Sequence, residues 1–266
     1  MTLTNENLIG SADARPAHPK IQKISPADLK DALVKGLDDF KAKPSHLFIL
    51  PIIYPLVIVI SFMLVAGKEI LPLVFPLVSG FALVGPLAAI GLYELSRRRE
   101  EGLDMSWEHA FNVIHSPSIG AIVRLSALLG VIYFAWLGAA LVIYWSIFGS
   151  TVPATIGEFA WLVFATSSGW TLIIVGCSVG FVFALVVLAI SAVSFPLLLD
   201  RDVGTMTAIQ TSVRTFLTNP VTMSIWGLVV ASLLFIGSLP YFVGLAVVMP
   251  VLGHATWHLY RKVVEW

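Results

Sequence analysis

Two histidines near the end of the chain have the spacing most suggestive of chemistry. His254 and His258 are four residues apart, so on a helix their imidazoles lie on the same face. Such a pair is only part of a metal site, because structural and catalytic metals need three or four ligands. The sequence has no HExxH motif, CxxC motif or acidic cluster that would complete it. We therefore predict no metal and no cofactor, and keep haem or metal ligation by His254 and His258 as an alternative.

Glu94 and Trp257 are the other candidate functional residues. Aligning Pro86 with Pro250 places Glu94 opposite His258, and both lie within about one helical turn of a basic run. One interpretation is a polar cluster at the cytoplasmic mouth of the protein. The alternative is that helix ends meet headgroups and water there. Ionisable residues in membrane helices point to function by default, so these residues are the first to test.

Basic residues close two of the hydrophobic stretches. They are candidates for binding anionic lipid headgroups, although membrane topology alone also explains them and is the favoured explanation. They are Arg97, Arg98, Arg99, Arg261 and Lys262.

Signals for soluble enzymes and nucleic-acid binders are lacking. The sequence contains no nucleophile elbow, phosphate loop or paired catalytic carboxylates. The 16 basic residues balance the 16 acidic ones, which does not favour nucleic-acid binding. The single cysteine, Cys177, cannot form an intramolecular disulfide. We do not expect an enzyme.

Composition predicts an all-α polytopic membrane protein. The chain is 58% hydrophobic and only 12% charged, with a mean hydropathy of +0.90. A helix needs about 20 apolar residues to cross the hydrocarbon core. Long uncharged runs of that length predict six crossings, at residues 46–66, 70–95, 119–148, 171–199, 220–238 and 243–260. Residues 158–170 are apolar but interrupted, and we leave open whether they are interfacial, re-entrant or part of a crossing.

The crossings are organised as three parallel repeats. Each repeat is predicted to be an amphipathic helix followed by a transmembrane hairpin, over residues 25–101, 102–204 and 205–266. The amphipathic segments are residues 25–42, 104–114 and 205–218, and each is followed by a proline. A soluble helix packed on the loops is the alternative for the first one. Residues 1–24 lack periodicity and an apolar signal sequence, so we predict a disordered tail and no cleavable signal peptide.

The distribution of positive charge predicts the orientation. All basic residues except Lys68 fall in four segments that share one side if there are six crossings. The positive-inside rule then places both termini in the cytoplasm of a bacterial cell, with the protein in the inner membrane.

Three stretches resemble a family of uncharacterised bacterial integral membrane proteins. They are P-V-L-G-H-A-T-W-H-L-Y-R-K at residues 250–262, S-F-P-L-L-L-D-R at residues 194–201, and T-S-V-R-T-F-L-T-N-P at residues 211–220. Members are sometimes labelled as cytochrome c oxidase subunits. The resemblance implies no catalytic residues, and six histidines with only two well inside a crossing exclude a catalytic haem–copper subunit.

The sequence therefore predicts a non-catalytic inner-membrane protein that contacts membrane lipids. An accessory or assembly role in a larger membrane complex, such as a respiratory oxidase, is the leading hypothesis. A small-solute channel lined by the second and sixth crossings is the first alternative, and a membrane haem or metal protein is the second.

Overall fold

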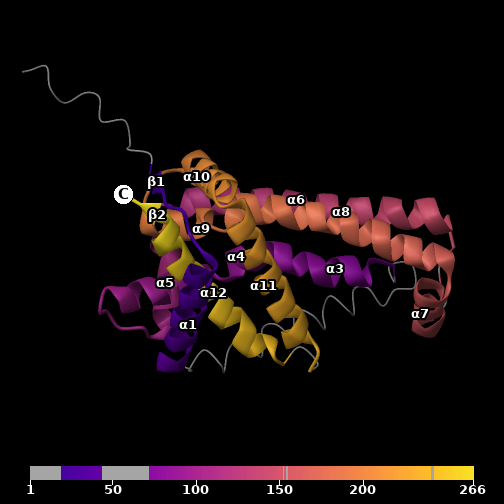
Figure 1. Ribbon diagram of the computed structural model, residues 1–266, viewed down its shortest axis with the longest axis horizontal. Coiled ribbons are helices and arrows are strands. Elements are labelled where there is room, and N and C mark those ends of the chain that lie inside the picture. The colour runs from indigo at the N-terminus through magenta and orange to yellow at the C-terminus, as the bar shows by residue number, and fades with distance from the viewer. Residues whose placement is uncertain (1–18, 44–71, 152, 154, 241–242) are drawn as a thin grey trace, which may run out of the picture.

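The computed structural model describes residues 19–43, 72–151, 153, 155–240 and 243–266, and within them the chain is almost entirely helical (Figure 1). Its only described strands are β1 (Lys20–Ile21) and β2 (Val264–Glu265), which pair antiparallel. The all-α class is confirmed.

Three of the described helical stretches are long and apolar enough to cross a membrane. They are α6 (Ile119–Phe148), the run Ser167–Asp200, and α11 (Pro220–Ser238). The Ser167–Asp200 run consists of α8 (Ser167–Ser191) and α9 (Ser194–Asp200). The third and fifth predicted crossings agree with α6 and α11 at both ends, and the fourth lies within the α8–α9 run.

The other three predicted crossings differ in outcome. Residues 46–66 lie outside the described part of the chain. The second crossing, described from residue 72, is broken into α3 (Val74–Gly80), η3 (Phe81–Val84), α4 (Gly85–Ala88) and α5 (Ile90–Glu100). Prolines and glycines explain the breaks, because proline removes a backbone donor and glycine is a poor helix former. The sixth forms α12 (Leu245–Val263), which is not among the described helices that are long and apolar enough to cross a membrane. Six crossings and a three-unit repeat stay predictions.

Two of the three predicted amphipathic segments form α-helices. They are α1 (Pro26–Ala42) and α10 (Thr205–Thr218). Ser25 caps α1 through a capping box with Asp28. The third segment forms a 3-10 helix, η4 (Trp107–His115), rather than an α-helix. Residues 158–170 are divided between α7 (Ile156–Ala165) and the start of α8, with Thr166 accepting a hydrogen bond from the Gly169 amide as the cap.

The predicted disorder of residues 1–24 does not extend to residues 20–24. Besides the β1–β2 pair, Asn219 fastens this segment: its Oδ1 accepts from the Ile24 amide at 2.9 Å and its Nδ2 donates to the Gln22 carbonyl at 3.0 Å. Composition could not reveal this, because the partners lie almost 200 residues away along the chain.

The core forms where α12 meets α1, α5 and α9 (Figure 1). Its largest fully buried side chains include Trp257 and Tyr260 of α12, Tyr93 of α5 and Phe195 of α9. The α6 and α8 helices run side by side and point away from this core, whereas α11 and α12 leave it in a different direction (Figure 1). Gly180 of α8 allows close packing against α6, since a Cβ there would lie 3.0 Å from Trp136.

Helices α1 and α12 are in close backbone contact. A Cβ on Gly36 would lie 2.6 Å from the Ala255 amide nitrogen and 2.7 Å from the Val251 carbonyl oxygen. Both are backbone atoms, so neither can move aside without shifting a helix. The first amphipathic helix is therefore a packed helix rather than one that only rests on headgroups.

We predict that Gly36→Ala lowers the free energy of unfolding by about 1–3 kcal/mol, the usual cost of overpacking. Gly130→Ala is the matched control, because a Cβ there meets nothing within 4 Å. It should leave stability unchanged or raise it slightly, since alanine favours helix. Thermal unfolding in detergent measures both, and equal midpoints for the two variants would contradict the close contact.

Candidate functional site

A buried polar cluster lies where α1, α5 and α12 meet. Its members, the Asp39 cluster, are Asp39 of α1, Ser96 and Arg99 of α5, and His254 and His258 of α12. Ser96 Oγ lies 2.5 Å from Asp39 Oδ2 and 2.7 Å from His254 Nδ1. His258 Nε2 lies 2.9 Å from Asp39 Oδ2, and Arg99 Nη1 lies 2.7 Å from Asp39 Oδ1.

The hydrogen-bond pattern determines which groups carry protons. An ionised carboxylate only accepts, so Ser96, His258 and Arg99 all donate to Asp39. Ser96 has a single hydroxyl proton, and it is used on Asp39. His254 must therefore donate from Nδ1 to the Ser96 oxygen, which requires either the Nδ1–H tautomer or the imidazolium.

Asp39 is held in its charged form. Burial alone would raise the pKa of its carboxyl, but hydrogen bonds from His258 and Ser96, together with the charges of His258 and His254, outweigh burial and lower the pKa below its ordinary value of 3.8. The side chain is only 5% exposed. This carboxylate is stable there because several donors from two other helices surround it.

Ion pairs surround the Asp39 cluster at the same end of the molecule. Glu94 accepts two hydrogen bonds from Arg97, both at 2.9 Å, in a bidentate pair. Glu100 accepts from Trp257 Nε1 at 3.0 Å and from Arg261 Nε at 3.0 Å.

The C-terminus is tied to the rest of the chain in the same way. Tyr260 donates to Asp200 at 2.6 Å, which links α12 to α9. Lys262 Nζ lies 3.0 Å from both Asp28 and Asp31 of α1. The charged residues at this end therefore hold helices together.

The Asp39 cluster contains serine, histidine and aspartate, the residue types of a hydrolytic triad, but not its arrangement. Ser96 and His254 are both 0% exposed, so no substrate reaches the hydroxyl. Ser96 also bonds Asp39 directly, whereas in a triad the histidine lies between the other two. The geometry suits positioning and charge stabilisation.

The same geometry bears on metal binding. His254 Nδ1 and His258 Nε2 are both engaged in hydrogen bonds within the Asp39 cluster. Among the residues that the structure describes, no group of three or more His, Cys, Asp and Glu has metal-binding geometry. Haem or metal ligation by this pair stays a prediction.

The structure brings His254 and His258 together on one helix face. Glu94 lies in a surrounding ion pair with Arg97, and Trp257 donates a hydrogen bond to Glu100. Each of the five basic residues expected at headgroups has an acidic partner within the chain. The pairs are Arg97 with Glu94 and Glu101, Arg98 with Glu94, Arg99 with Asp39, Arg261 with Glu100 and Asp200, and Lys262 with Asp28 and Asp31. Lipid binding by these residues stays a prediction.

Asp39 and Ser96 were not among the functional residues predicted from the sequence. A signal was available: Ala32, Gly36, Asp39 and Phe40 follow the spacing of one helix face, and all four are buried. Small residues at positions 32 and 36 marked a closely packed face on which Asp39 also lies.

We predict that Asp39→Asn destabilises the protein by about 3 kcal/mol, because Ser96, Arg99 and His258 would lose the buried charged acceptor to which they all donate. Asp38→Asn is the matched control, since Asp38 is the neighbouring residue on the exposed side. It should change stability by less than about 0.5 kcal/mol. Chemical unfolding in detergent compares the two, and equal effects would rule out a special role for Asp39.

The stability difference between wild type and Asp39→Asn should depend on pH. Because the folded pKa of Asp39 lies below 3.8, the stabilisation is fully present above about pH 4 and is lost as the pH falls through the folded value. Unfolding midpoints measured from pH 7 to pH 3 should therefore converge only at the acid end. Convergence at neutral pH would show that Asp39 is not held ionised.

Comparisons with known proteins identify the type of protein. Residues 74–200 match the model of a family described as "Predicted integral membrane protein (DUF2189)". The match covers the middle of the chain, whereas the stretches that carry the resemblance in the sequence lie at residues 194–201, 211–220 and 250–262. No curated protein matches the chain, and no solved structure does. The chain is thus an integral membrane protein with helices able to span a membrane, and its resemblance to an uncharacterised family of such proteins is confirmed.

Proposed function

We propose that this chain is a non-catalytic protein of the bacterial inner membrane that acts through its apolar helix faces, as an accessory or assembly subunit of a larger membrane complex such as a respiratory oxidase. The observation that carries the proposal is the separation of polar and apolar surface. The buried polar groups of the Asp39 cluster are used to join helices, and the long helices leave most of their surface uncovered.

Burial within the spanning helices supports external contacts. In their most apolar windows, only 17% of α6, 6% of the Ser167–Asp200 run and 22% of α11 is buried inside the chain. In a membrane, lipid or other helices must cover the remainder, and helix association there depends on close packing.

One face of α6 is suited to such packing. Val131, Phe134, Val142 and Trp145 lie at helical spacing and are exposed. Gly138 lies among them, and a Cβ there would meet nothing within 4 Å. A small residue between large apolar ones forms a notch into which a partner helix can fit.

Pairing between the two ends of the described chain supports the proposal that both termini lie on one side of the membrane. Residues 20–21 pair with residues 264–265 through the β1–β2 ladder. A chain whose ends pair in this way crosses the membrane an even number of times, which agrees with the positive-inside argument.

We predict that the tagged protein, extracted from its native membrane in mild detergent, co-purifies with another membrane protein. Gly138→Phe should fill the α6 notch and lower recovery of the partner severalfold. Gly176→Phe is the matched control on α8, because a Cβ there also meets nothing within 4 Å. Quantitative mass spectrometry of the eluates measures recovery. A clean monomer or homo-oligomer from wild type would contradict the proposal, and equal loss in both variants would exclude the α6 face.

The channel alternative has one observation in its favour. A cavity has residues of the predicted second and sixth crossings in its wall, on α4, α5 and α12. Residues of α8 and α11 complete the wall of this cavity. None of its described lining residues is charged, so the wall offers little to a hydrated solute. Flux of small solutes into liposomes containing the protein would favour the channel over the accessory role.

A further inference from the structure

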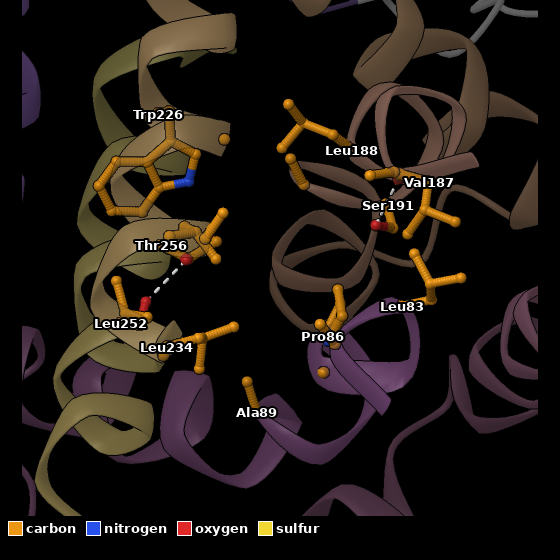
Figure 2. Close-up of a pocket in the computed structure, with 18 of the residues that line it drawn as sticks. Leu83, Pro86, Ala89, Val187, Leu188, Ser191, Trp226, Leu234, Leu252 and Thr256 are labelled. Atoms are coloured by element: carbon orange, nitrogen blue, oxygen red, sulfur yellow. Dashed lines mark hydrogen bonds between the residues drawn. The ribbon is translucent and has the colours of Figure 1, made fainter. Parts of the chain in front are cut away.

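A cavity between α8 and α11 is not explained by the polar cluster. Its volume is about 300 Å³, at the lower end of the range for small-molecule pockets. In Figure 2, Trp226 and Thr256 face Leu188 and Ser191 across the open space, and Pro86 lies below them.

The wall of the cavity is apolar and accommodates no free charge. Two of its hydroxyls are already used, because Ser191 donates to the Val187 carbonyl at 2.6 Å and Thr256 donates to the Leu252 carbonyl at 2.7 Å (Figure 2). Water needs two to four polar partners to occupy a cavity, so this space is unfavourable for water. An empty cavity is also unfavourable, since its lining loses dispersion contacts.

The cavity opens sideways, between two helices that are able to span a membrane. Phe181 of α8 and Leu228 of α11 line it and are 56% and 60% exposed. Its floor is closed, since Leu92 of α5 and Leu252 of α12 are buried. With α8 and α11 in the bilayer, the medium at the opening is lipid hydrocarbon.

The length of the cavity matches one leaflet. Its lining on α8 runs from Phe181 to Ala192, which spans about 16 Å at 1.5 Å per residue. Half of the hydrocarbon core is about 15 Å. The Ala192 end lies closest in sequence to Asp200 at the end of α9, at the level where headgroups are expected.

We propose that this cavity binds one acyl chain of a membrane phospholipid, which enters between α8 and α11. Small volume, apolar lining, sideways opening and leaflet length all favour a single hydrocarbon chain. This inference rests on the membrane setting of α8 and α11 but not on the accessory role, so either can fail without the other.

The test uses full-length protein reconstituted in phosphatidylethanolamine that carries a diazirine on one acyl chain. The protein is then extracted, freed of loose lipid by gel filtration and irradiated, so that only retained lipid reacts. We expect adducts on residues 181–192 and 224–234 and none on the exposed face of α6 at residues 131–145. No retained label, or label spread equally over α6, would overturn the proposal.

Variants refine the result. Ala231→Trp fills the opening from α11 and should lower retained label at least about fivefold, and Ala184→Trp should do the same from α8. Ser232→Trp is the matched control, because Ser232 is exposed on α11 but does not line the cavity. Label that is unchanged in both filling variants, or lost equally in the control, would contradict the assignment.

Competition experiments test whether the bound group is a phospholipid acyl chain. Excess unlabelled phospholipid should displace the probe, whereas an isoprenoid quinone should not. Displacement by the quinone alone would overturn the assignment to an acyl chain.

Discussion

The architecture depends on one buried negative charge. A carboxylate removed from water is costly unless several donors compensate it. Asp39 obtains these donors from α5 and α12 at once, through Ser96, Arg99 and His258. Its charge is therefore stable only when three helices are correctly packed, which makes the cluster a requirement for assembly of this end of the protein.

The surrounding ion pairs extend this constraint to the C-terminus. Glu100 and Asp200 both contact α12, through Trp257, Arg261 and Tyr260. Exposed ion pairs contribute little individually, but these share partners and lie beside a buried core. Basic residues from which the membrane orientation is predicted thus also join helices. The long helices extend from this fastened end, with apolar surface available to lipid and to other helices.

Much of the fold followed from the sequence because local patterns were sufficient. Apolar length predicted the extents of α6 and α11 closely, and a following proline marked the ends of α1 and α10. The spacing of His254 and His258 correctly placed them on one face. The structure of the second predicted crossing was harder to predict, because several prolines and glycines break it at points that length and hydropathy do not specify.

A common side for the positive charge is a prediction from the sequence, whereas membrane residence and helical class were determined by the sequence alone. These properties depend on composition and on spacing within single helices. Only the tertiary structure decided that Asp39 is buried, that the basic residues considered for headgroup binding have acidic partners, and that a cavity opens between α8 and α11. Each of these results from contacts between residues far apart in the chain, where the energy of a side chain depends on neighbours that local sequence does not name.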